Sequence, residues 1–151
     1  MIEVTTVWKS GLLFEGQAGN YRFNISAPQP PLDKKAVSPH ELMLFSLASS
    51  CCIEVMTKLQ AGGHKLDKFE VKAQGNYDKD SENHLYSSID LSFHCEGNCD
   101  HTAILNSVEY SQFLSRSIGY FLNQIVPIRW DIYINGTIAA EGIAHYYDQP
   151  K

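Results

Sequence analysis

The segment that most constrains the fold is a long apolar stretch with clear helix start and stop signals. Ser38 precedes Pro39, and Glu41 stands three residues after Ser38. A serine at the N-cap, a proline at the first helical position and a glutamate at the third form a capping box. The pair Gly62-Gly63 supplies a C-terminal stop. These signals predict a helix from Pro39 to about Ala61.

Apolar residues surround the first half of this helix instead of lining one face. They are Leu42, Met43, Leu44, Phe45 and Leu47. A helix that is hydrophobic on most sides is expected to be buried on most sides. One chain of 17.0 kDa would cover such a helix poorly. We therefore expect a homodimer whose interface encloses it.

Strand signals lie on both sides of the helix. Residues 4–8, 12–14 and 21–25 are short runs of β-formers separated by glycines, which predicts a three-stranded meander. Residues 69–73 and 85–95 alternate apolar and polar side chains, which predicts two further strands.

A second helix is expected from about His101 to Asn123, with Pro127 beyond its end. The pair Asn135-Gly136 then marks a hairpin turn between two last strands. The expected order is βββ-α-ββ-α-ββ, an α+β fold in a single domain spanning residues 1–151.

Composition narrows the partners and the compartment. The net charge of −5 and the pI of about 5.6 argue against nucleic acid or an anionic membrane as a partner, because both require a basic face. No apolar run is expected to span a bilayer. Residues 1–8 lack the pattern of a signal peptide, so we expect a cytoplasmic protein. Four cysteines in that compartment are expected to be free thiols, metal ligands or redox groups.

The sequence of residues 38–55 resembles the central helix of the OsmC/Ohr superfamily, the osmotically inducible and organic hydroperoxide resistance proteins. Residues 8–16 resemble the first hairpin of that superfamily, and residues 124–128 resemble the exit from its second helix. The resemblance implies an OsmC-like fold in an intertwined homodimer with buried central helices. It also implies a role in oxidative or osmotic stress, in which cysteines on those helices reduce organic hydroperoxides.

The chain departs from the superfamily pattern at the residues that perform this reaction. Alignment of the central helix places the reactive cysteine at Ser50, and the second-helix cysteine falls near Arg116. Leu13 stands near the position of the first-hairpin arginine. His40 replaces the glutamate after the proline, with Glu41 one residue further on. A serine cannot pass through the sulfenic acid that this chemistry requires.

Cys51 is the candidate catalytic residue if the register shifts by one position. The alternative is that Cys51 and Cys52 are small buried core residues. An ordinary thiol has a pKa near 8.5, and burial raises it further. Without a nearby guanidinium or a second thiol, Cys51 is expected to give weak or lost thiol peroxidase activity.

Cys95 and Cys99 lie close together in the sequence, flanked by His94 and His101. Sulfur and imidazole ligands suit zinc, but this spacing matches no familiar zinc motif. We expect no tight metal and no cofactor here. A redox pair is the other interpretation of these two thiols.

Three functions follow from these observations. The first is a thiol-dependent peroxidase with weak or lost activity. The second is a non-enzymatic member that binds a small hydrophobic molecule or a peroxide in the dimer-interface pocket, with Glu41, Ser50 and Arg116 as binding residues. The third is a metal-binding or redox-sensing protein that uses Cys95 and Cys99.

Overall fold

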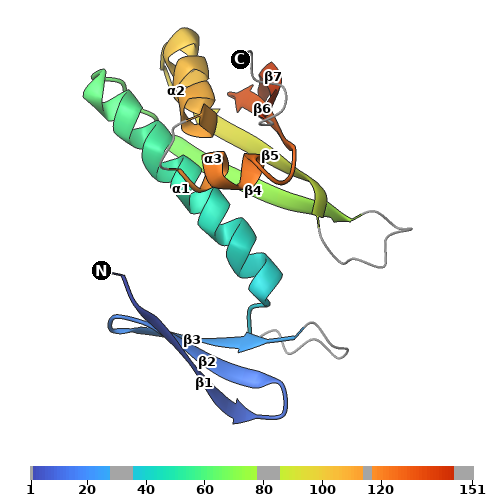
Figure 1. The fold of residues 1–151 in the computed structure, drawn as a ribbon. Coiled ribbons are helices and arrows are strands. Elements are labelled where there is room, and N and C mark those ends of the chain that lie inside the picture. The colour runs from blue at the N-terminus through green and yellow to red at the C-terminus, as the bar shows by residue number, and fades with distance from the viewer. Residues whose placement is uncertain (1, 28–35, 78–85, 114–116, 145–151) are drawn as a thin grey trace. The chain divides into compact units, whose positions relative to one another are not determined.

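The computed structural model describes residues 2–27, 36–77, 86–113 and 117–144. The chain divides into two compact units, residues 1–43 and 44–151, and each is described by itself. The expectation of a single domain over residues 1–151 stays a prediction. Figure 1 shows the elements, which comprise helices and two separate sheets, as expected for an α+β chain.

The first unit is built on a three-stranded antiparallel meander. It contains β1 (Val4–Ser10), β2 (Leu13–Ala18) and β3 (Tyr21–Ser26), in that spatial order. Gly11 and Gly19 occupy the two turns with φ of 52° and 59°, a backbone region that glycine adopts at low cost. The predicted meander is therefore confirmed, with strands one to three residues longer than the sequence pattern indicated.

The helix α1 (Pro39–Ala61) has the predicted bounds. Glu41 Oε2 accepts hydrogen bonds from the Ser38 backbone N at 2.8 Å and from Ser38 Oγ at 2.7 Å. The Glu41 backbone N donates to Ser38 Oγ at 3.2 Å. This reciprocal pairing is the predicted capping box, and it satisfies backbone donors that the first turn leaves open.

The second unit contains a four-stranded mixed sheet. Its strands are β4 (Lys68–Tyr77), β5 (Tyr86–Glu96), β6 (Ile128–Ile134) and β7 (Thr137–Ala144), which lie in numerical order. The β5–β6 pair is parallel and the other two pairs are antiparallel. The β6–β7 turn is the predicted Asn135-Gly136, with φ of 49° and 80°.

Helices cover one face of this sheet (Figure 1). The core joins alternate residues of β5 and β6 to one stripe of α1. The fully buried members include Ile89, Leu91, Phe93, Cys95, Ile128 and Ile132 from the strands and Leu47, Cys51, Val55 and Leu59 from α1. The α1 residues recur every four positions, so within one chain the helix buries a single stripe.

The expected second helix is two helices. α2 (His101–Phe113) and α3 (Ile118–Asn123) are separated by Ser117, whose φ of −83° and ψ of 156° are extended. Ser117 Oγ accepts a hydrogen bond from the Tyr120 backbone N at 2.9 Å, so it caps α3. The prediction of one helix from about His101 to Asn123 was wrong, because the extended backbone and capping side chain of Ser117 begin a separate helix at Ile118.

α1 also corrects an expectation about membranes. By length and composition alone it could span a bilayer, with a mean hydropathy of 1.5. The expectation that no apolar run is long enough was therefore wrong. Core helices of soluble proteins pass the same test, so the finding is weak evidence for a membrane. Cytoplasmic location stays a prediction.

Candidate functional site around Cys51

Cys51 lies at the centre of the helix layer. It is on the inner stripe of α1, with 1% of its surface exposed. The neighbouring Cys52 is half-buried because successive helical side chains point about 100° apart. The predicted burial is therefore confirmed for Cys51 and wrong for Cys52, which is only half-buried. The catalytic role of Cys51 stays a prediction.

Polar groups of α2 surround the Cys51 sulfur. Gln112 Nε2 donates to Cys51 Sγ at 3.5 Å and to Ser111 Oγ at 3.0 Å. Gln112 and Ser111 are both fully buried. Cys51 is thus held by neutral polar partners within the core.

Burial raises the pKa of the Cys51 thiol to about 11. Desolvation is the largest cause, because it disfavours the thiolate. Hydrogen bonds from Gln112 and Ser111 lower the pKa, while the charges of Glu54 and Cys52 raise it. Among the described residues, no cation contributes to this shift.

Ser50 belongs to an adjacent polar group that joins α1 to α3. Its Oγ donates to Glu54 Oε1 at 3.3 Å and accepts from the Ile118 backbone N at 3.4 Å. Desolvation raises the pKa of the Glu54 carboxyl, and the hydrogen bond from Ser50 opposes that shift. Glu54 Oε2 is buried without a hydrogen-bond partner among the described residues.

The other predicted site residues are placed less centrally. Glu41 serves the helix cap, and the backbone hydrogen bond from Ser38 is the largest cause that lowers its pKa. Whether Glu41 also binds a ligand stays a prediction. Arg116 lies outside the described residues.

Cys95 and Cys99 do not form part of this group of side chains. Cys95 is buried in the sheet face, while Cys99 is half-buried. Desolvation raises the pKa of Cys95 to about 11, with a smaller contribution from Cys99. Across residues 2–27, 36–77, 86–113 and 117–144, no cluster of three or more His, Cys, Asp or Glu side chains could hold a metal ion.

Sequence reasoning missed Gln112, Ser111 and Glu54 as site residues. The spacing did contain a signal, because Ile104, Val108 and Gln112 recur at four-residue intervals on one face of α2. A glutamine that continues an apolar stripe is expected to be buried with a partner. The identity of that partner depended on the packing of α1 against α2.

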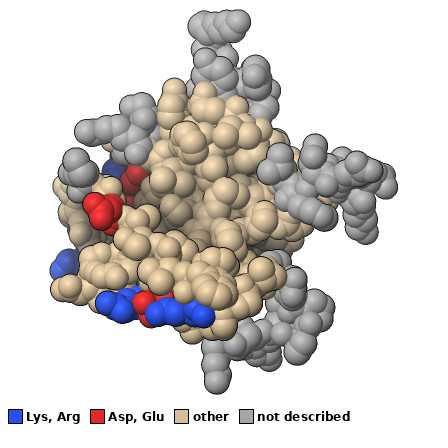
Figure 2. All heavy atoms as spheres, turned by 60° about the horizontal axis from the view of Figure 1, so that its bottom comes forward, with Lys and Arg blue, Asp and Glu red and all other residues tan. Residues whose placement is uncertain are grey.

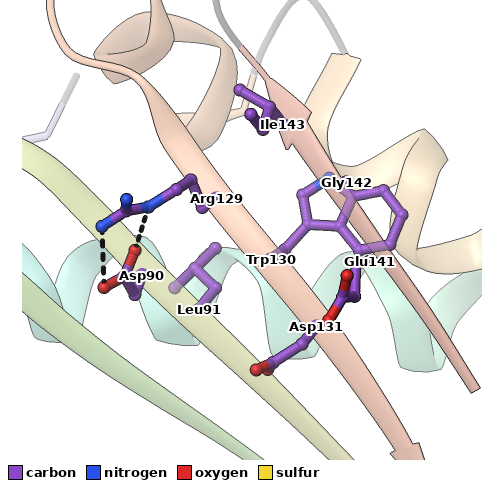
Figure 3. A pocket seen from close by; sticks show the side chains of 8 residues that line it. All are labelled: Asp90, Leu91, Arg129, Trp130, Asp131, Glu141, Gly142 and Ile143. Carbon is purple, nitrogen blue, oxygen red and sulfur yellow. Dashed lines mark hydrogen bonds and ion pairs between the residues drawn. The ribbon is translucent and has the colours of Figure 1, made fainter. Parts of the chain in front are cut away.

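A separate groove lies on the four-stranded sheet, and its lining does not include Cys51. It has a volume of about 580 Å³, and β5, β6 and β7 contribute all of its lining residues. Figure 3 shows the Arg129 guanidinium paired with Asp90 at one side of this groove, where Arg129 Nε lies 2.6 Å from Asp90 Oδ1. This cation already has a carboxylate partner.

Few charged side chains are visible on the face shown in Figure 2, and they lie toward its left and lower edges. Among the described residues on that face, basic and acidic side chains alternate and form no broad basic patch. In the first unit, Glu15 Oε1 pairs with Lys9 Nζ at 3.4 Å and with Arg22 Nη1 at 3.2 Å.

A family model described as OsmC-like protein matches residues 32–115, more than half of the chain. The chain belongs to the OsmC-like protein family. Residues 38–55, the stretch that carries the resemblance in the sequence, lie inside the matched range. Among curated proteins, no sequence matches this chain significantly.

Solved structures of OsmC-like proteins share its fold. An OsmC-like protein from Mycoplasma pneumoniae has a TM-score of 0.77 at 12% identity, covering 89% of this chain and 96% of its own. An organic hydroperoxide resistance protein from Elizabethkingia anophelis has a TM-score of 0.70 at 11% identity, with the same coverage. The organic hydroperoxide resistance protein OhrB of Bacillus subtilis scores 0.64 at 12% identity, covering 88% and 98%. These identities establish a shared fold.

Proposed function

We propose that this OsmC-like protein has weak or lost thiol peroxidase activity, with Cys51 as its reacting thiol. One observation carries the proposal. Cys51 is a fully buried thiol whose pKa is about 11 and whose hydrogen-bonding partners are neutral. Membership of the family and the fold of the hydroperoxide resistance proteins supply the reaction class.

The reaction requires a thiolate. The Cys51 sulfur attacks one oxygen of the hydroperoxide, the O–O bond breaks, and the other oxygen leaves and takes a proton as an alcohol. Cys51 becomes a sulfenic acid. With a pKa of about 11, only about one thiol in ten thousand is ionised at neutral pH. This small fraction limits the rate.

Regeneration of the thiol is also poorly supported. The four cysteines are Cys51, Cys52, Cys95 and Cys99, so neither α2 nor α3 contains a second thiol. Cys52 points away from Cys51 around the helix. An external thiol would have to reduce the sulfenic acid, which is otherwise open to overoxidation.

The test is turnover of cumene or tert-butyl hydroperoxide with a dithiol reductant near neutral pH. We expect the wild-type rate to stay close to that of the dithiol alone, with any excess lost in Cys51→Ser. Cys52→Ser is the matched control on the same helix and should behave as wild type. Efficient turnover that Cys51→Ser abolishes and Cys52→Ser retains would contradict the proposal.

We also propose a homodimer that covers the outer side of the helix layer. Phe45 and Ile53 of α1 are 64% and 67% exposed in one chain, and Phe121 and Ile125 beside α3 are 63% and 71% exposed. Large apolar side chains that form a contiguous exposed patch mark a protein–protein interface. Light scattering at micromolar concentration should give twice the mass of the chain. Ile53→Glu should shift it toward a monomer, whereas Gln74→Glu, at an exposed position of β4 outside the helix layer, should not. A monomeric wild type would contradict the proposal.

A second candidate function is binding of a small hydrophobic molecule. A groove of about 390 Å³ between α1 and α2 is lined by Glu54, Thr57, Lys58, Ala61 and Tyr110. Its volume is within the range of small-ligand sites. The Lys58 ammonium is held over the Tyr110 ring at 4.2 Å, whereas Glu54 Oε2 is without a partner in the described part of the chain. An apolar alcohol could donate its hydroxyl to that oxygen.

Nuclear magnetic resonance titration with medium-chain primary alcohols tests this second candidate. We expect saturable shifts for residues of the groove in wild type and their loss in Ala61→Trp, which fills it. Glu109→Gln changes an exposed carboxylate of α2 outside the groove and serves as the control. Equal binding by wild type and Ala61→Trp would exclude the groove as the site.

A further inference from the structure

Gln112 is a polar side chain in the most buried part of the helix layer. Its exposed fraction is 0%, and it continues the inner stripe of α2 formed by Ile104 and Val108. Its backbone O accepts a hydrogen bond from Asn123 Nδ2 at 3.1 Å, which ties the end of α2 to α3. The position of Gln112 is therefore fixed by both helices.

The hydrogen-bond pattern sets the orientation of its amide. In the structure, Ser111 Oγ donates to Val108 O at 2.7 Å and accepts from Gln112 Nε2 at 3.0 Å. The Gln112 nitrogen therefore faces Ser111, and its second hydrogen reaches Cys51 Sγ. Gln112 Oε1 is buried without a partner among the described residues. A buried carbonyl without a partner costs free energy of folding. The side-chain hydrogen bonds of Gln112 are therefore those of its amide nitrogen.

We propose that Gln112 is a positioning residue that sets the reactivity of Cys51 by donating its amide to the sulfur. The inference rests on the proposed function only in taking Cys51 as the reacting thiol. A donor aimed at sulfur stabilises the thiolate and so supports proton loss. The amide is neutral, so its effect is smaller than that of a guanidinium.

The test measures Cys51 ionisation directly, from thiolate absorbance against pH. Each protein is compared with its own Cys51→Ala counterpart, which subtracts the other thiols and the tyrosines. Gln112→Leu removes the donor and should raise the pKa of Cys51 by about one unit or more. Alkylation by iodoacetamide at a fixed pH below that pKa should then slow about tenfold. Gln112→Glu keeps the shape of the side chain. It should raise the pKa of Cys51 above its value in Gln112→Leu, because it places a negatively charged carboxylate beside the sulfur.

Gln124→Leu is the matched control. Gln124 donates to Tyr120 O at 3.2 Å and to Asn123 Oδ1 at 2.9 Å, and neither bond involves Cys51. We expect its Cys51 titration to match that of wild type. An unchanged Cys51 titration in Gln112→Glu, or an equal shift in Gln124→Leu, would overturn the proposal, even if Gln112→Leu fails to fold.

Hydroperoxide assays on the same variants separate this inference from the proposed function. A titration that moves as expected in a protein that turns over hydroperoxide efficiently would support the role of Gln112 and contradict the proposed function. An unchanged titration in Gln112→Glu, together with slow or absent turnover, would overturn the role of Gln112 and agree with the proposed function.

Discussion

The rate at which an organic hydroperoxide oxidises Cys51 should rise about a thousandfold between pH 7 and pH 10. The reacting species is the thiolate, and the pKa of Cys51 is about 11. Below that pKa, the thiolate fraction increases about tenfold for each pH unit. Trapping of the sulfenic acid by dimedone, measured by mass spectrometry of the Cys51 peptide at a series of pH values, gives this rate.

The shape of the pH profile is more informative than any one rate. A thiol activated by a cation would reach a plateau near neutral pH, because it would already be ionised there. A plateau for Cys51 below about pH 8 would therefore show that an activating group acts on the sulfur. Cys52 lies in the same peptide as Cys51, so fragment ions must assign each adduct to one of the two sulfurs. Cys52 is then an internal control, since desolvation raises its pKa without the partners that hold Cys51.

Because of Cys51, the free energy of unfolding should also fall at alkaline pH. The ordinary pKa of 9.0 applies to the unfolded chain, and the folded value is about 11. Below pH 9 both states keep the proton, so the stabilising effect is complete. From pH 9 to pH 11 the unfolded chain loses the proton while the folded chain retains it, so the free energy of unfolding falls with rising pH. The two-unit difference is equivalent to about 3 kcal/mol.

Urea unfolding of wild type and Cys51→Ala at about pH 8 and at about pH 11 measures this loss. We expect wild type to lose about 2 kcal/mol more than Cys51→Ala over this interval, because at pH 11 the folded thiol is itself half ionised. Cys95, whose pKa is also about 11, is present in both proteins and cancels in the comparison. The same loss in both proteins would mean that Cys51 is not held as a neutral thiol in the folded chain.

The elements that the sequence predicted best are those whose signals are local. The bounds of α1 followed from Ser38, Pro39 and the glycine pair, because a cap and its stop lie within a few residues of the helix ends. The Asn135-Gly136 turn was predictable for the same reason. The break before α3 was missed because Ser117 follows apolar periodicity that continues through it, and because its cap on Tyr120 is visible only with the backbone in place.

The site was predictable in part. The position of Cys51 in the central helix followed from the motif, and its burial followed from the apolar neighbours. The two polar groups did not follow, because Gln112 and Ile118 lie 61 and 68 residues from their α1 partners. Such contacts depend on the packing of three helices on one sheet, which periodicity alone does not determine.

The parallel pairing of β5 with β6 has a consequence for how the chain folds. In the same sheet, the β4–β5 and β6–β7 pairs are antiparallel, and each can form as a local hairpin. β5 and β6 are joined by the long connection of residues 97–127, so pairing them costs the chain entropy of closing that connection. Long-range pairings of this kind fold slowly. We expect the two hairpins to appear early, and the docking of β6 on β5, over a completed helix layer, to be the rate-limiting step.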